Sequence, residues 1–330
     1  MTPDALVESG PLLPGGTLPV HVRPLVADVD LTAWVKEHRD TVEAHLTGTG
    51  GILFRGFGVR GAAEFEQVVS SLYPDLVGEH ERSSPRHQVS GHVFTSTDHP
   101  ADQTIFLHNE MSYSSTWPMR IAFHCVTAAE TGGETPIAST REVLRLIPQD
   151  IRERFEARKV MYVRNYNEGF GLPWQTSFQT DDPAVVDAYC REAGMQAEWK
   201  DGGRLCTRVV GEAVRRHPVT GERVWFNHAT FFHVSTLEPV LRDALLADFA
   251  EDDLPTNSFY GDGSPIEADV LDILRDAYRQ ATVAFPWQRG DVLLLDNMLA
   301  AHARSPYTGA RKIVVSMAQP LTTDTSAARA

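Results

Sequence analysis

Cysteine is scarce in this chain, and the placement of the few that occur excludes two kinds of small, cross-linked fold. Only three cysteines are present, Cys125, Cys190 and Cys206, and no two of them form a C-x-x-C pair. Neither a disulfide framework nor a zinc knuckle is therefore indicated. Widely separated cysteines of this kind are typical of reduced thiols in an intracellular protein.

Long apolar runs and an excess of basic charge are also missing. No stretch reaches the length of a membrane span without charged residues. The first sixteen residues, MTPDALVESGPLLPGG, lack the basic start and the apolar run of a signal peptide. The formal net charge is −14, because 30 Lys and Arg are outnumbered by 44 Asp and Glu. Such a surface repels nucleic acid and anionic lipid, so we expect a cytoplasmic protein with neither as a partner.

What is present is a mixture of strand and helix patterns without an internal repeat or a clear linker. We therefore expect a single domain over residues 1–330, with a Pro- and Gly-rich wrap at 1–28 and a disordered tail at 321–330. Helical spacing occurs at 31–46, 62–73, 140–147, 151–158, 183–193, 237–249 and 266–281. Strand-like runs occur at 52–57, 105–107, 121–126, 160–165, 195–210, 223–227, 292–295 and 312–317. This pattern favours a mainly β protein with flanking helices, an α+β class built on one β-core.

One long polar segment, residues 78–104, interrupts these patterns. It is rich in Ser, His, Pro and Gly and shows little periodicity. Loops of this length inside a compact domain are often functional, for example as lids over a site. The segment is therefore a candidate functional loop.

The pattern His-x-acid, which suits a metal site, occurs twice. His38 and Asp40 lie inside a helical pattern, where residues two apart face different directions, so this pair is predicted to be a solvated helix face. His108 and Glu110 directly follow an apolar run. In an extended chain these two side chains point to the same side, about 7 Å apart along the strand. The second pair is therefore the candidate for metal binding.

A third metal ligand is predicted at His302. It follows the strand 292–295 after a short loop and so lies at the mouth of that strand. Two histidines and one carboxylate form the facial triad of non-haem iron(II) oxygenases, which leaves open positions on the metal. The remaining histidines His124, His217 and His233 are interpreted as structural.

Two further residues suit the binding of a 2-oxo acid. Arg311 comes nine residues after His302, across a turn, at the start of a strand that should lie beside the one leading to His302. Its guanidinium matches a carboxylate in bidentate fashion. Lys312 points the opposite way on a strand and is the second choice. The turn before Thr135 contains Gly132 and Gly133, and the Thr135 hydroxyl is predicted to donate to the same co-substrate.

These motifs together resemble the taurine-dioxygenase-like family of Fe(II)- and 2-oxoglutarate-dependent dioxygenases. The matching segments are FRGF at 54–57, HNEMSY at 108–113, GGETP at 132–136 and GDVLLLDNMLAAHARSPYTGARK at 290–312. The resemblance implies a double-stranded β-helix, a jelly-roll or cupin-like fold. It also implies that His108, Glu110 and His302 bind Fe(II), that Arg311 and Thr135 bind 2-oxoglutarate, and that O₂ is consumed.

Two positions refine the resemblance. Taurine dioxygenase has Asp where this chain has Glu110, and it has an Arg for the sulfonate where this chain has Val315. Glu110 and the segments 160–180 and 223–233 are closer to the branch with clavaminate synthase and the syringomycin-pathway aspartyl hydroxylase. That branch implies an amino acid or amino-acid-derived substrate in specialised metabolism such as antibiotic biosynthesis, either free or tethered to a peptidyl carrier protein.

The function predicted from these residues is hydroxylation of an unactivated C–H bond, with 2-oxoglutarate and O₂ converted to succinate and CO₂. Desaturation, epoxidation and cyclisation remain open because they begin with the same hydrogen abstraction. A metal-dependent hydrolase and a non-catalytic β-sandwich binding module are the alternatives from other classes. The predicted substrate contacts are Asn109, Ser112, Tyr113, Arg164, Trp174, Gln175, Arg208 and Asn227.

Overall fold

The largest β-sheet carries the N-terminal and C-terminal parts of the chain side by side. The structure is a computed structural model that describes residues 6–78, 86–166 and 171–323. Within these ranges the sheet has the strand order β1-β2-β3-β17-β7-β20-β5-β4, and only β2 and β3 run parallel. The strands are β1 Val7–Pro11, β2 Val20–Pro24, β3 Gly51–Phe54, β4 Gln88–Ser90, β5 Val93–Thr95, β7 Thr116–Thr127, β17 Val292–Asp296 and β20 Lys312–Thr322.

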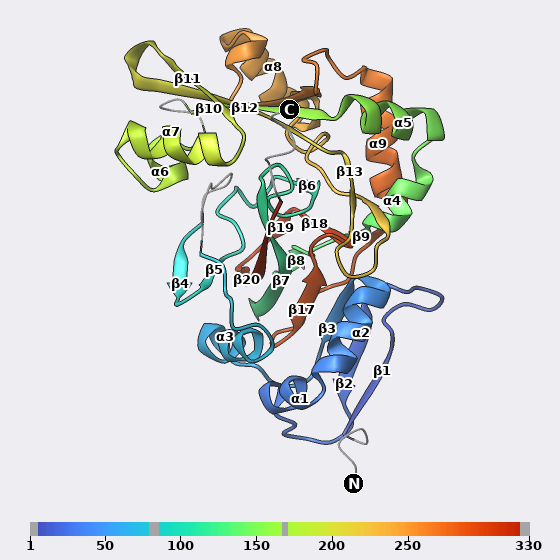
Figure 1. Ribbon diagram of the computed structural model, residues 1–330. Coiled ribbons are helices and arrows are strands. Elements are labelled where there is room, and N and C mark those ends of the chain that lie inside the picture. Colours follow the sequence, from blue (N-terminus) through green and yellow to red (C-terminus); the bar gives the residue numbers. More distant parts are fainter. Residues whose placement is uncertain (1–5, 79–85, 167–170, 324–330) are drawn as a thin grey trace.

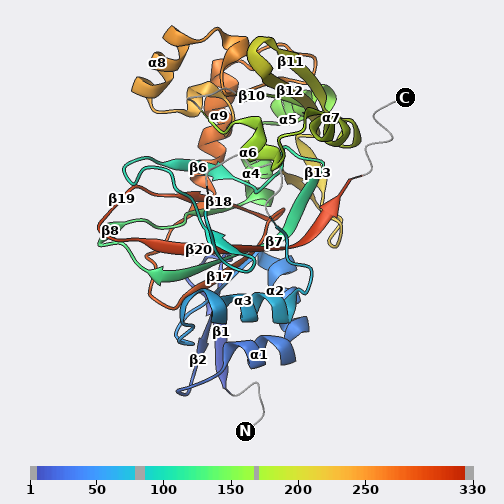
Figure 2. The same ribbon diagram turned by 90° about the vertical axis from the view of Figure 1, so that its left-hand side faces the viewer.

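A smaller sheet with the order β16-β9-β18-β6 packs against the large one (Figure 2). Its strands are β6 Ile105–His108, β9 Ile137–Ser139, β16 Thr282–Val283 and β18 Ala300–Arg304. The buried core between the two sheets includes Phe123 and Leu293 from the large sheet and Ile137 and Ala300 from the small one. The two sheets form the double-stranded β-helix that the sequence predicted.

Three helices cover the outer face of the large sheet (Figure 1). They are α1 Leu31–Glu37, α2 Arg39–Thr49 and α3 Gly61–Leu72. Both faces of strand β17 are apolar. Its side chains Val292 and Leu294 pack toward these helices, and Leu293 and Leu295 pack toward the small sheet. Alternate side chains of a strand point to opposite faces, so a continuous apolar run marks a strand that is buried on both.

The single helix expected at 31–46 is two helices. Asp30 caps the first, because its carboxylate accepts from the backbone N–H groups of Thr32 and Ala33. His38 ends this helix, and its Nδ1 donates to the carbonyl of Trp34 at 2.9 Å. Among the described residues, His38 and Asp40 belong to no group of potential metal ligands.

The other helices gather on the far side of the small sheet, at the top of Figures 1 and 2. They surround a sheet with the order β11-β12-β10-β15. The helices are α4 Thr140–Leu146, α5 Gln149–Arg158, α6 Trp174–Phe178, α7 Pro183–Glu192, α8 Pro239–Asp248 and α9 Ala268–Gln280, and the strands are β10 Val160–Tyr166, β11 Gln196–Lys200, β12 Arg204–Gly211 and β15 Thr256–Tyr260. Two short ladders join β8 Thr131–Gly132 to β19 Tyr307–Thr308 and β13 Val214–Arg216 to β14 Arg223–Trp225.

Both ends of the chain differ from expectation. The segment 1–28 contributes β1 and β2 to the large sheet and is therefore more than a surface wrap. Strand β20 continues to Thr322, so the start of the predicted tail at 321–330 is ordered by pairing with β7, and residues 324–330 lie outside the described residues. The segment 78–104 contains β4 and β5, and its residues 79–85 also lie outside the description. No described helix has the length and apolar character that crossing a bilayer requires.

A buried ion pair lies at the end of β17. The Asp296 carboxylate is fully buried and accepts from Arg120 Nη1 at 2.5 Å and from His217 Nε2 at 3.0 Å. Its other oxygen, Oδ1, accepts from the backbone N–H groups of Met298 and Leu299. Arg120 also donates to Glu43 on α2, at 2.8 Å. The carboxylate therefore joins β7, β17 and the turn that follows β17.

We expect Asp296→Asn to lower the free energy of unfolding by about 3–5 kcal/mol, because it leaves the buried Arg120 cation without its nearest counter-charge. Urea denaturation followed by circular dichroism measures this change. Glu142→Gln is the matched control, because Glu142 pairs with Arg145 on the exposed face of α4 and should leave stability almost unchanged. Equal effects of the two substitutions would contradict the assignment of Asp296 as a structural anchor.

Candidate metal centre

The two histidines selected from the sequence face each other across neighbouring strands of the small sheet. His108 ends β6 and His302 lies inside β18, where the strand register makes them direct partners. Their ring centroids are 4.4 Å apart. The sequence placed His302 at a strand mouth after a short loop, and this is corrected: the chain reverses in the turn 297–299 and pairs again at once, so His302 lies within a strand.

Glu110 reaches the same point from a turn and not from a strand. Strand β6 stops at His108, so the extended-chain argument for this pair is wrong in detail. The side chain of Asn297 holds the turn instead. Its Oδ1 accepts from the Glu110 N–H at 2.8 Å, and its Nδ2 donates to the carbonyls of Glu110 and Pro118, both at 2.8 Å. Asn109 Nδ2 donates to the Asn297 carbonyl at 2.6 Å. We refer to these four contacts as the Asn297 clasp.

The three candidate ligands converge in a buried position. One ligand atom from each of His108, Glu110 and His302 lies within 4.8 Å of the other two, and His302 Nε2 is 3.9 Å from Glu110 Oε2. His108 Nδ1 donates to the carbonyl of Phe106 at 2.9 Å, so its Nε2 keeps a lone pair for a metal. Bonds from a first-row metal to nitrogen or oxygen are about 2 Å long, so small side-chain shifts would bring all three onto one ion. The donor set and its spacing fit ferrous iron.

The charges around the triad favour the protonation states that a metal needs. Burial lowers the pKa of His108, and it lowers that of His302 well below the usual value, so both rings are neutral near pH 7. Burial by itself would raise the pKa of Glu110, but the cation of Arg86 and the neighbouring His108 outweigh it and the pKa is lowered. The three side chains thus present two neutral imidazoles and one carboxylate.

Arg86 is a functional candidate that the motif analysis did not select. Its Nη2 donates to Glu110 Oε2 at 2.8 Å, and both side chains are about one-tenth exposed. The only signal in the sequence was its place in the polar segment 78–104, which was interpreted as a candidate functional loop. A contact between residues 24 positions apart across such a segment has no periodic pattern that would reveal it.

The predicted anchors of the 2-oxo acid are brought together by the pairing of β8 with β19. Thr135 follows β8 and is buried, and its hydroxyl oxygen accepts from Trp287 Nε1 at 3.1 Å. Arg311 follows β19, and its Nε donates to the carbonyl of Gly133 at 2.8 Å. Gly133 has a φ of +72° and a Cβ there would lie 3.0 Å from the Arg311 side chain, so both backbone and space require glycine.

The position of Arg311 relative to the metal ligands differs from expectation in one respect. It precedes β20, which pairs with β7 and β5 in the large sheet and does not lie beside β18. Burial lowers the pKa of Arg311 to about 10, so it stays charged at neutral pH. No carboxylate of the described residues forms an ion pair with it, and the neighbouring Lys312 is exposed. Thr135 lies two residues before Ile137, which pairs with His302, so the anchors and the triad share one end of the β-helix.

Three of the predicted substrate contacts gather around His228, whose ring centroid is 5.9 Å from that of His108. Ser112 Oγ is 2.5 Å from His228 Nδ1, and the Tyr113 ring centroid is 4.9 Å from that of His228. The Arg164 guanidinium lies over the Tyr113 ring at 5.3 Å. Phe231 stacks on His108 with ring centroids 4.3 Å apart. His228 directly follows the predicted contact Asn227, whereas Phe231 was not selected from the sequence, although it belongs to the segment 223–233 that carried the family resemblance.

Most of the other predicted substrate contacts have partners elsewhere in the protein, and a substrate role for them stays a prediction. Asn227 uses both ends of its amide on the backbone of Ala213 and Ala229, and Asn109 belongs to the Asn297 clasp. Arg208 pairs with Glu198 on the surface of the β11–β12 hairpin. Trp174 donates to the carbonyl of Gly203 and packs in a separate apolar cluster, and Gln175 beside it is exposed.

The three histidines interpreted as structural have structural contacts. His124 is fully buried, stacks on Phe65 and makes a hydrogen bond to the carbonyl of Asp291. His217 hydrogen-bonds Asp296. His233 makes local contacts with Ser235 at the start of a short 3₁₀ turn.

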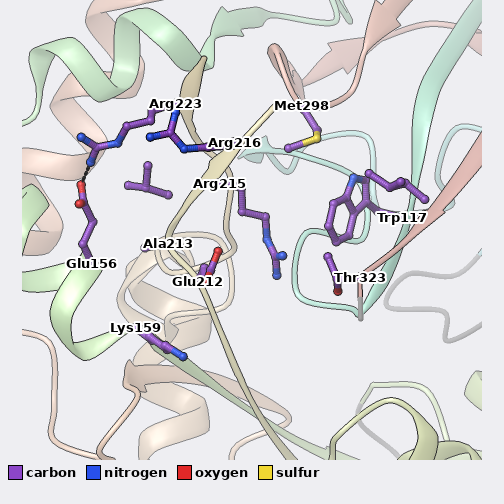
Figure 3. A pocket seen from close by; sticks show the side chains of 12 residues that line it. Trp117, Glu156, Lys159, Glu212, Ala213, Arg215, Arg216, Arg223, Met298 and Thr323 are labelled. Atoms are coloured by element: carbon purple, nitrogen blue, oxygen red, sulfur yellow. Dashed lines mark hydrogen bonds and ion pairs between the residues drawn. The ribbon is translucent and has the colours of Figure 1, made fainter. Parts of the chain in front are cut away.

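A cavity of about 580 Å³ lies apart from the triad, between β13, the end of α5 and the C-terminal end of β20 (Figure 3). Arg215 points into it and lies over the Trp117 ring at 4.6 Å, and Arg223 forms an ion pair with Glu156 at its edge. Met298 lines the cavity and directly follows Asn297 of the clasp. None of the three candidate ligands lines this cavity, so it is not the metal centre.

Comparison with solved structures identifies the same architecture. PvcB, an Fe, α-ketoglutarate-dependent oxygenase from an isonitrile synthetic pathway, is 17% identical with a TM-score of 0.56, and the match covers 95% of this chain and 92% of PvcB. A taurine dioxygenase from Burkholderia xenovorans is 15% identical with a TM-score of 0.57 and coverage of 97% and 95%. At these identities the likeness concerns the fold.

Sequence comparison goes further. The dapdiamide synthesis protein DdaC of Enterobacter agglomerans is 37% identical over 311 residues, which cover 94% of each chain. A clavaminate synthase-like protein of Arabidopsis thaliana is 29% identical over 314 residues, 92% of this chain and 91% of the relative. Residues 18–317 match the family described as taurine catabolism dioxygenase TauD, TfdA family. The chain therefore belongs to the TauD, TfdA family and is a 2-oxoglutarate-dependent non-haem iron dioxygenase.

Proposed function

We propose that this dioxygenase hydroxylates an unactivated C–H bond of an amino acid or amino-acid derivative, with His108, Glu110 and His302 holding Fe(II). The observation that carries the proposal is the buried convergence of these three side chains within 4.8 Å. A second set of residues, suited to a dicarboxylate, lies at the same end of the β-helix. The substrate is either free or tethered to a peptidyl carrier protein.

The proposed roles of the chain's own residues follow from their contacts. His108 and His302 offer neutral nitrogens, and Glu110 offers the single negative charge. The Arg311 guanidinium binds the distal carboxylate of 2-oxoglutarate as a fork. Thr135 already accepts from Trp287, so its hydroxyl proton is directed to a second acceptor, for which the co-substrate is the natural candidate. Phe231 covers one face of His108 and keeps water from that side.

When bound, the iron supplies the oxidising chemistry, in which O₂ and 2-oxoglutarate yield succinate and CO₂ while a substrate C–H bond is oxidised. The protein's part is to orient that C–H bond. Hydroxylation is favoured over halogenation because Glu110 fills the position that a halide would need. Desaturation, epoxidation and cyclisation begin with the same hydrogen abstraction and stay as alternatives at this site.

The substrate class rests on the relatives and on one substitution. The name of one relative refers to dapdiamide synthesis and that of the other to clavaminate synthase, which supports a role in specialised metabolism. Val315 stands where taurine dioxygenase places a sulfonate-binding Arg, and it is fully buried in β20. A sulfonate is therefore disfavoured. Arg164, which lies over Tyr113 near His228, is the candidate contact for a substrate carboxylate.

The first test is spectroscopic. Fe(II) added to the metal-free protein without O₂, followed by 2-oxoglutarate, should give a weak visible charge-transfer band. On admission of O₂, succinate release measured across amino acids and carrier-bound aminoacyl groups should identify a substrate that gains one oxygen atom by mass. A hydrolase or a binding module would give no band, and that result would remove the proposal.

The second test concerns the co-substrate anchor. Arg311→Met should weaken 2-oxoglutarate binding about 10- to 100-fold, because a charge-assisted bidentate contact is lost. Titration of the charge-transfer band measures this change, and Fe(II) affinity should stay at the wild-type value. Lys312→Met is the matched control, since Lys312 is adjacent but exposed. Loss of 2-oxoglutarate binding in Lys312→Met with retention in Arg311→Met would reverse the assignment.

A further inference from the structure

The carboxylate of the triad has a partner outside the metal-binding set. Arg86 Nη2 donates to Glu110 Oε2 at 2.8 Å, and this is the same oxygen that lies 3.9 Å from His302 Nε2. Both side chains are about one-tenth exposed, so the ion pair is formed away from bulk water. The contact therefore acts on the oxygen that faces the His302 imidazole.

A second arginine, Arg304, connects the segment that follows Arg86 to strand β18. Arg304 lies on β18, two residues after His302, and its guanidinium donates to the carbonyls of His99, Pro100 and Gln103. These carbonyls belong to the stretch that leads into β6. Arg86, at the start of this stretch, donates to Glu110. Arg304, on β18, donates to carbonyls near the end of the stretch. The two contacts tie the stretch to Glu110 and to β18.

We propose that Arg86 is a positioning residue for the iron site, which holds the Glu110 carboxylate in the orientation that the metal requires. The inference rests on the proposed function, because it assumes that Glu110 binds the metal. A carboxylate has about four acceptor positions, so one hydrogen bond to Oε2 leaves positions on both oxygens for an ion. Partners of this kind orient the ligands of a metal site, and their loss typically weakens metal binding or activity about 10- to 100-fold.

The geometry also allows the opposite effect, in which Arg86 competes with the metal for Glu110. In that case removal of the guanidinium would strengthen metal binding. The positioning role is favoured because, among the described residues, the Asn297 clasp holds the backbone of Glu110 and Arg86 gives the hydrogen bond to its side chain. With the backbone fixed and the carboxylate fixed separately, both parts of the ligand are restrained.

The test measures metal affinity directly and does not depend on turnover. Mn(II) and Co(II) are titrated calorimetrically, without O₂, into the full-length metal-free protein, the variants Arg86→Met and Arg86→Lys, and the control Arg145→Met. Arg145 pairs with Glu142 on the exposed surface of α4, far from the metal ligands in the sequence. The visible spectrum of bound Co(II) reports the geometry of the site, which a merely structural ion pair would not alter.

We expect Arg86→Met to bind both metals about 10- to 100-fold more weakly than the wild type and to change the Co(II) spectrum. Arg86→Lys keeps the positive charge but lacks the planar guanidinium, so its metal affinity should lie between those of Arg86→Met and the wild type. If Arg86→Met melts at a lower temperature, Arg86→Lys decides the question. Wild-type affinity or tighter binding in the variants would overturn the inference. Absence of metal binding by the wild type would instead overturn the proposed function.

Discussion

The turn between β17 and β18 depends on one buried carboxylate and the amide beside it. Asp296 is fully buried, neutralises Arg120 and caps the backbone of the turn. Asn297, the next residue, fixes the backbone of Glu110 through two hydrogen bonds of its side chain. Two adjacent side chains thus set both where β18 starts and where the carboxylate ligand stands. Since β18 carries His302, this turn positions both His302 and Glu110, two of the three candidate ligands.

The site lies where the two sheets of the β-helix meet, and each sheet provides a different part of it. The small sheet carries His108 and His302 on paired strands. The large sheet carries the strand that begins after Arg311. The packing of one sheet on the other therefore sets the distance between the metal ligands and the co-substrate anchor. A core of interleaved apolar side chains is stiff, which suits a centre whose ligands must hold their separation.

The sequence was informative where chemistry is concentrated in short motifs. The residue types and order of His108 and His302 predicted the group of potential metal ligands that the structure brings together, and the family pattern predicted the β-helix. The sequence was uninformative where contacts cross long distances: the clasp made by Asn297 and the ion pair of Arg86 depend on pairing that no local periodicity encodes. It was ambiguous for Arg208, which pairs with Glu198, because a charged residue near a motif has the same appearance whether it binds a ligand or a neighbouring surface carboxylate.

The direct cross-strand pairing of His108 with His302 restricts the number of residues between Asp296 and His302, as well as their identity. Neighbouring residues of a strand point to opposite faces, so a shift of one position in β18 would turn the imidazole of His302 to the other side of the small sheet. An insertion or deletion between Asp296 and His302 would separate the ligands even with every motif residue intact. Homologues that keep this chemistry should therefore vary in loop length elsewhere, and keep this interval constant.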